Sequence, residues 1–308
     1  MTTLICVGAC YLDTILKQVT FARMPATKLL TLHSVPYFPE EDSKLRADSL
    51  RVRRGGNCPN SLEVLQQLLA RQAEHTVKPC LISVLPSRDS PAAKKIIESF
   101  GTQGIVDLDR CVYREGHTEA ASSYIIRSEA TGSRTLVNFN DLPEMTLDEF
   151  ANATSDIAGR TWWHFEGRIP ETTLQCIQYL RESRPDASIS VEVEKPGRQR
   201  QGLEELAAEA DVVFYSKSWA QDQGYASAEE CLEAQSRLTR KAAVGAGDTF
   251  IAGMLFALLH HHEDWRIRDK VRFAVQLATS KVQMEGFCGV GAHVNEGLSS
   301  EDGTQALV

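Results

Sequence analysis

Residues 243–250 read Ala243-Val244-Gly245-Ala246-Gly247-Asp248-Thr249-Phe250, and a long apolar segment follows them. This order predicts a helix that begins beside the small residues. The first N–H groups of a helix are unpaired and lie at the positive end of its dipole, so a phosphate can approach them closely. Asp248 can then act as general base toward a hydroxyl while the backbone of Gly245, Ala246 and Gly247 stabilises a transferring phosphoryl group. Taken alone, the pattern equally fits a glycine-rich helix start with Asp248 as a capping residue.

A second glycine-rich stretch, Arg54-Gly55-Gly56-Asn57-Cys58-Pro59-Asn60-Ser61, lies nearer the N-terminus. In this order, the two stretches resemble the two signatures of the ribokinase (PfkB) family of sugar kinases. Cys6-Val7-Gly8, the run 164–168 (His-Phe-Glu-Gly-Arg) and the run 190–196 (Ser-Val-Glu-Val-Glu-Lys-Pro) are similar to the ketohexokinase branch of that family. The resemblance extends from about residue 3 to about residue 290, which is nearly the whole chain.

The resemblance implies where a sugar would bind. Asp13 and Asp42 match carboxylates that accept hydrogen bonds from sugar hydroxyls, one on the first strand and one in a lid. Gly56, Asn57 and Asn60 match a sugar-contacting pattern in which glycine permits close approach and the amides both donate and accept. The expected substrate-binding residues are Asp13, Asp42, Gly56, Asn57, Asn60, Arg134 and Asp248.

The same resemblance implies ATP as phosphoryl donor and Mg²⁺ as the ion that bridges its phosphates. Gly245, Gly247, Gly286 and Cys288 are the residues expected to contact ATP, and Glu166 and Glu194 are expected to hold Mg²⁺ indirectly, through water. The implied reaction transfers the γ-phosphate to a primary hydroxyl of a ketohexose such as fructose. Ribose, a nucleoside or a sugar acid presents similar hydroxyls, so the substrate stays open at this point.

Strand and helix patterns alternate along the chain. Apolar runs predict strands at residues 3–8, 79–85, 162–166, 188–193 and 212–215, and amphipathic segments predict helices at 57–71 and 90–100. This alternation predicts an α/β fold whose parallel sheet is covered on both faces and binds ligands at the carboxyl ends of its strands. The resemblance makes it a ribokinase-like three-layer α/β/α sandwich with a small β-sheet lid.

The lid and the domain limits follow from the same patterns. A strand within 43–54 and a hairpin of residues 122–127 and 134–139 are expected to build the lid, within about 14–54 and 110–140. One kinase domain is expected over residues 1–290, followed by a polar, disordered tail over residues 291–308. Lid strands with exposed apolar surface favour a homodimer formed through the lid.

Two departures from the family pattern stand out. An extra stretch occupies about residues 22–38, and Lys241-Ala242-Ala243 runs almost directly into the Gly245–Asp248 turn. Relatives carry several tens of residues there, including sheet strands, so part of the central sheet is predicted to be missing before Ala243. We hypothesise that both departures arise from the gene model or from splicing, and a transcript that encodes this junction would overturn that idea. A second interpretation is a catalytically impaired relative that binds sugar without turnover.

Composition excludes several classes of function. The chain has 308 residues, 43% of them hydrophobic, and a formal net charge of −8 without a large basic cluster, which argues against nucleic acid as a partner. Its apolar runs are too short to span a bilayer, which argues against a membrane protein. Eight scattered cysteines without a paired motif indicate reduced thiols and a cytoplasmic protein.

Overall fold

The computed structural model describes residues 1–17, 41–42, 44, 47, 49–74, 76–102, 104–127, 134–194, 202–237, 242–244 and 247–293. The strands are β1 (Thr2–Val7), β2 (Tyr11–Lys17), β3 (Ser49–Gly55), β4 (Val77–Ile82), β5 (Val84–Pro86), β6 (Val112–Arg114), β7 (Ser122–Arg127), β8 (Arg134–Phe139), β9 (Thr161–Glu166), β10 (Ser188–Val193), β11 (Val212–Tyr215) and β12 (Ala242–Val244). The helices are α1 (Asn57–Leu69), α2 (Pro91–Glu98), α3 (Leu147–Thr154), α4 (Pro170–Ser183), α5 (Leu203–Glu209), α6 (Lys217–Asp222), α7 (Ala228–Gln235), α8 (Gly247–Leu259), α9 (Ile267–Val282) and the 3-10 helix η1 (Val290–His293).

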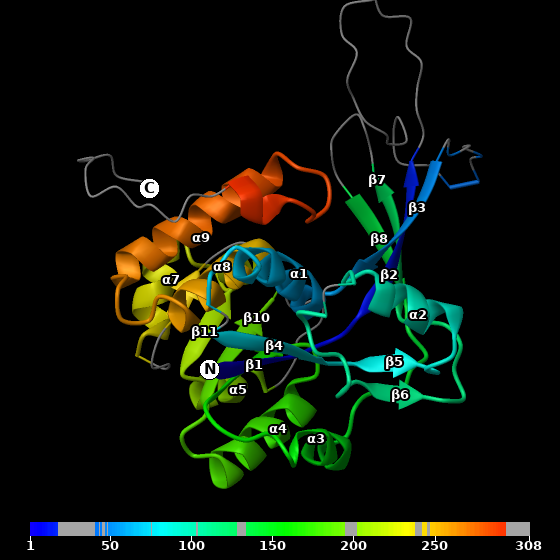
Figure 1. The fold of residues 1–308 in the computed structure, drawn as a ribbon. Helices are drawn as coiled ribbons and strands as arrows, with labels where there is room; N and C mark the ends of the chain where they lie inside the picture. The colour runs from blue at the N-terminus through cyan, green and yellow to red at the C-terminus, as the bar shows by residue number, and fades with distance from the viewer. Residues whose placement is uncertain are drawn as a thin grey trace, which may run out of the picture.

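The central sheet is parallel and has the strand order β12-β11-β10-β9-β1-β4. Successive residues of β1 face opposite layers: Leu4 and Cys6 pack with α1, α8 and α9, whereas Ile5 and Val7 pack with α3, α4 and α5. Figure 1 shows these two groups of helices above and below the sheet. The predicted three-layer α/β/α arrangement is confirmed, because the strands are apolar on both faces and need cover on both.

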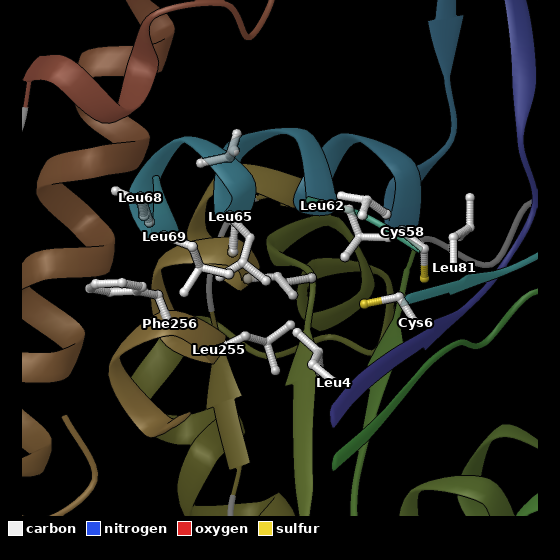
Figure 2. Packing of buried hydrophobic residues seen from close by; sticks show 14 of the residues in the cluster. Leu4, Cys6, Cys58, Leu62, Leu65, Leu68, Leu69, Leu81, Leu255 and Phe256 are labelled. Atoms are coloured by element: carbon white, nitrogen blue, oxygen red, sulfur yellow. The ribbon is translucent and has the colours of Figure 1, made fainter. Parts of the chain in front are cut away.

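The layer of α1 and α8 is a closely packed apolar core. Leu62, Leu65 and Leu69 recur along one face of α1 and lie over Leu4 of β1 and Leu255 of α8 (Figure 2). All five are at most 1% exposed. Burial of a leucine of this kind stabilises the fold by about 1.5–3 kcal/mol. This core fixes α1 relative to α8, and the N-terminal residues of both helices face the cavity described below.

The lid is a separate four-stranded sheet with the order β3-β2-β7-β8. β7 and β8 pair as the predicted antiparallel hairpin, and β2 joins β7 in parallel and β3 in antiparallel orientation. The predicted strand within 43–54 is present as β3. Every side chain of β8 is exposed, so this strand contributes little to the apolar core of the chain.

The junction before Ala243 forms the last strand of the central sheet. β12 has three residues, pairs with β11, and has no strand on its other side within the described part of the chain. The extra stretch at 22–38 lies outside the described residues. At the C-terminal end, η1 continues the packed chain to His293, inside the segment expected to be a tail, and Gly291 donates its N–H to Gln67 Oε1 at 3.2 Å. Across the described ranges, no helix is long and apolar enough to cross a membrane.

Candidate active site

A cavity of about 630 Å³ lies between the lid and the carboxyl ends of the central strands. Its wall combines β2, β3, β7 and β8 of the lid with the first residues of α1 and α8 and the last turn of α9. The expected site residues that line it are Asp13, Gly56, Asn57, Asn60, Arg134, Glu166, Glu194, Gly247 and Asp248. Residues far apart in sequence therefore meet around one space, at the sheet edge where α/β folds bind ligands.

Other expected residues lie elsewhere. Asp42 is an exposed turn residue with φ 61° and is not among the described residues of the cavity wall. Cys288 lines a different groove, shared with Glu63 and Gln67, because the turn after α9 packs against α1. Gly286 is likewise not among the described wall residues, and Gly245 and Ala246 lie outside the described residues. The role of each predicted site residue stays a prediction.

Asp248 lies in the first turn of α8 and is tied to α1 by two hydrogen bonds. Asn60 Nδ2 donates to Asp248 Oδ2 at 2.8 Å, and Ser61 Oγ donates to the Asp248 backbone carbonyl at 2.9 Å. Burial raises the pKa of Asp248 from its usual 3.8 to about 7, with the Asn60 hydrogen bond acting in the opposite direction. A carboxylate with a pKa near neutrality, held in a fixed direction, has the properties of a general base.

The glycine pair before α1 is required by close packing. Gly56 has φ 103°, and a Cβ there would lie 2.1 Å from the carbonyl oxygen of Ala9. A Cβ at Gly55 would lie 2.5 Å from both carboxylate oxygens of Asp13. Any larger side chain would therefore displace the connection between β3 and α1 from Asp13 and from the end of β1.

Asp13 supplies a buried carboxylate from the lid. It lies on β2 between Arg53 of β3 and Ser123 of β7, and Arg53 Nε is 3.7 Å from Asp13 Oδ2. Burial raises the pKa of Asp13, while the Arg53 charge and the Ser123 hydroxyl lower it. Asp13 and Asp248 line the same cavity, which therefore has carboxylate acceptors from both the lid and α8.

Two groups at the site were missed from the sequence. Glu192 of β10 is buried and accepts a hydrogen bond from Asn57 Nδ2 at 3.2 Å, and burial together with the Asp248 and Glu166 charges raises its pKa. Lys281, in the last turn of α9, lines the cavity and lies 4.8 Å from the centre of the Phe287 ring. Glu192 lies two positions before the expected site residue Glu194, and this spacing was an available signal. Lys281 lies shortly before Gly286 and Cys288, which were expected to contact ATP, but no motif marked Lys281 itself.

Further acidic groups lie at the edge of the central sheet. Glu166 Oε2 accepts the Ala9 N–H at 2.8 Å, and Glu194 is exposed at the end of β10. Within the described part of the chain, no group of three or more His, Cys, Asp or Glu side chains is arranged to hold a metal ion. An ion at this edge would need oxygen ligands from a substrate or from water in addition to the protein.

Known proteins share both the sequence and this architecture. No protein-family model matches the chain. Mouse ketohexokinase is 27% identical over 300 residues, which cover 84% of this chain and 94% of the relative. The chain is a homologue of ketohexokinase. The family resemblance predicted from the motifs is thereby confirmed, and the match covers most of both proteins.

Solved structures agree on the fold. A ribokinase from Thermotoga maritima superimposes with a TM-score of 0.65 at 14% identity, over 96% of both chains. A ribokinase from Arabidopsis thaliana, complexed with ribose and ATP, superimposes with a TM-score of 0.65 at 17% identity, over 93% of this chain and 94% of that one. A fructokinase with bound ATP from Xylella fastidiosa superimposes with a TM-score of 0.60 at 15% identity, over 94% of this chain and 96% of that one. The predicted ribokinase-like fold is confirmed.

Proposed function

We propose that this chain is an ATP-dependent kinase that phosphorylates a primary hydroxyl of a ketohexose such as fructose. The observation that carries the proposal is the placement of Asp248, at the head of α8, in one cavity with Asp13 and Asn57. A base, sugar-binding groups and an anion-stabilising helix start are the parts that phosphoryl transfer needs. The ketohexokinase homologue and the ATP-bound structures of the same fold support this choice of acceptor and donor.

In this reaction the sugar lies between the lid and α1. The Asp13 carboxylate accepts hydrogen bonds from sugar hydroxyls, and the Asn57 amide contacts a further hydroxyl. Asp248 takes the proton of the primary hydroxyl. At the same time the hydroxyl oxygen of the sugar forms a bond to the γ-phosphorus, and the bond between this phosphorus and the ADP oxygen breaks. The N–H groups at Gly245, Ala246 and Gly247 and the Lys281 ammonium stabilise the charge on the transferring group. We propose Arg134, on the lid side of the cavity, for the same phosphate region.

Mg²⁺ fits the donor chemistry of the cavity. The carboxylates of Glu166 and Glu194 line it together with Asp248, and carboxylate oxygens, water and phosphate oxygens are the ligands that Mg²⁺ prefers. When bound, the ion neutralises charge on the ATP phosphates. We propose Glu166 and Glu194 as groups that hold its water ligands.

A coupled assay of ADP release tests the function. We expect turnover with fructose and ATP, and less with ribose, a nucleoside or a sugar acid. Thermal unfolding is measured in parallel, because a ligand that binds the native state raises the melting temperature. Stabilisation by sugar without release of ADP from any acceptor would identify the chain as a sugar-binding relative and overturn the kinase proposal.

We propose a homodimer formed through the outer face of the lid. Tyr124 and Val137 are cross-strand partners on this face, Phe139 and Leu50 project from it, and all four are about half exposed or more. A second copy of the chain would cover this face. The described cysteines are all free thiols, which supports the cytoplasm as the compartment.

The dimer is tested by analytical ultracentrifugation of the wild type and of Val137→Lys. We expect a dimer for the wild type and dissociation for the variant, because a charge at the centre of an apolar interface is costly. Ile267→Lys is the matched control, since Ile267 of α9 is also 64% exposed but lies outside the lid. A dimer that survives Val137→Lys would show that the lid face is not the interface.

A further inference from the structure

A buried arginine contacts the asparagine that is hydrogen-bonded to the candidate base. Arg54, the last residue before the glycine pair, is 4% exposed, and its guanidinium contacts four groups. Nε donates to Ser99 Oγ at 2.9 Å, Nη2 pairs with Glu63, and Nη1 donates to Asn60 Oδ1 at 3.5 Å. The guanidinium carbon also lies 4.3 Å from the centre of the Phe100 ring. These contacts come from α1 and from the end of α2, so the charge is held in place on several sides.

Asn60 lies between this arginine and Asp248. Its amide oxygen accepts from Arg54, and its amide nitrogen donates to Asp248 Oδ2 at 2.8 Å. A guanidinium can only donate hydrogen bonds, and an ionised carboxylate can only accept them. The reversed amide would place its oxygen against the carboxylate and its NH₂ against the guanidinium, and both contacts would be repulsive. The two charges together therefore select one orientation of the Asn60 amide.

We propose that Arg54 is a positioning residue for Asp248 and acts through the Asn60 amide, so that Asn60 serves the base in addition to any contact with the sugar. The proposal rests on the proposed kinase function. It gives a role to a buried arginine that is not among the described residues of the cavity wall. A buried hydrogen bond to a charged group contributes more free energy than one between neutral groups. The orientation of the Asn60 amide, which bonds to Arg54 and to Asp248, therefore matters for turnover.

The kinetic test is a double-mutant cycle of Arg54→Met, Asn60→Ala and the double variant. Each single change is expected to lower kcat about 10-fold to 100-fold, with a KM for sugar within about twofold of wild type for Arg54→Met. The double variant is expected to be no worse than Asn60→Ala, because Arg54 acts through that amide. Arg54→Lys restores part of kcat, since it keeps the charge. Arg51→Met, an exposed arginine on the same strand, is the control that leaves kcat unchanged. Multiplicative losses in the double variant would overturn the proposal.

A second readout is independent of turnover. The side-chain amide signal of Asn60 is followed by NMR after ¹⁵N-asparagine labelling and is assigned by its loss in Asn60→Ala. We expect a strongly hydrogen-bonded proton in the wild type and a weaker, faster-exchanging one in Arg54→Met at unchanged backbone signals, because Asp248 still accepts from the amide but the amide oxygen has lost its donor. A wild type that turns over no sugar but shows this change would refute the kinase proposal and support the role of Arg54. An unchanged Asn60 signal in folded Arg54→Met would overturn that role.

Discussion

The two sheets of this molecule are buried to very different extents. In the central sheet, Leu4 and Ile5 are neighbours on β1 and both are fully buried, one beneath each layer of helices. In the lid, Val137 and Phe139 of β8 are exposed by more than half. Helices of the same chain cover both faces of the central sheet and stabilise it, whereas the stability of the lid depends on what covers its exposed face. The site draws on both, because the base Asp248 comes from the central domain and Asp13 comes from the lid.

The largest expected effect belongs to the central domain. Asp248→Asn keeps the shape of the side chain but removes the base, so kcat is expected to fall by roughly 10²–10⁴-fold. Sugar binding, measured as a thermal shift, should be largely retained. Asp222→Asn, an exposed aspartate on α6, is the control. Unchanged turnover in Asp248→Asn would remove Asp248 from the role of base.

Substitutions in the two sheets should lower the free energy of unfolding by different amounts. Leu65→Ala removes a side chain that is 1% exposed at the contact of α1 and α8, and should lower the free energy of unfolding by about 2–5 kcal/mol. Val137→Ala in the lid should lower the free energy of unfolding of the separate protomer by less than about 0.5 kcal/mol, because Val137 is 64% exposed within one chain. Urea unfolding of both variants measures the difference. Similar losses would show that the lid is as well packed in solution as the central sheet.

The lid should affect binding more than chemistry. Asp13→Asn removes the charge but keeps the size, and the loss of hydrogen bonds to a charged acceptor should raise the KM for fructose about 10-fold to 100-fold. The value of kcat should change less, because Asp248 is untouched. Steady-state kinetics at saturating ATP measure both. A fall in kcat with an unchanged KM would assign Asp13 to the chemical step.

Activity and stability should both depend on pH through Asp248. The pKa of Asp248 is about 7, so kcat/KM should fall about tenfold per unit as pH drops below 7 and should level off above it. The sign for stability is opposite: the native state keeps a proton that the unfolded chain releases near pH 3.8, so this contribution is complete below that pH and is lost as pH rises through 7. Urea unfolding at pH 5 and pH 8 should show a larger loss for the wild type than for Asp248→Asn, in which only the raised pKa values of Asp13 and Glu192 still contribute. Equal losses in both proteins would contradict the pKa.

Local sequence patterns were sufficient for most of the fold. The apolar runs at 3–8 and 162–166 and the amphipathic segment at 57–71 became β1, β9 and α1, because burial on both faces or on one face leaves a recognisable period. Asp13 and Gly56 were each predicted at the sugar site, and the neighbouring Gly55 packs directly against the Asp13 carboxylate. The resemblance of the motifs therefore predicted the closely packed residues of the site.

The sequence by itself determined that this chain is an α/β homologue of the sugar kinases, and it indicated Asp13, Asn57 and Asp248 as parts of one site. Only the tertiary structure decided which groups meet: Arg54 behind Asn60, Glu192 against Asn57, and Asp42 away from the cavity. The physical reason is that periodicity and motifs report short-range packing along one element. A hydrogen bond between Asn60 and Asp248, 188 positions apart, depends on how α1 and α8 pack across the sheet.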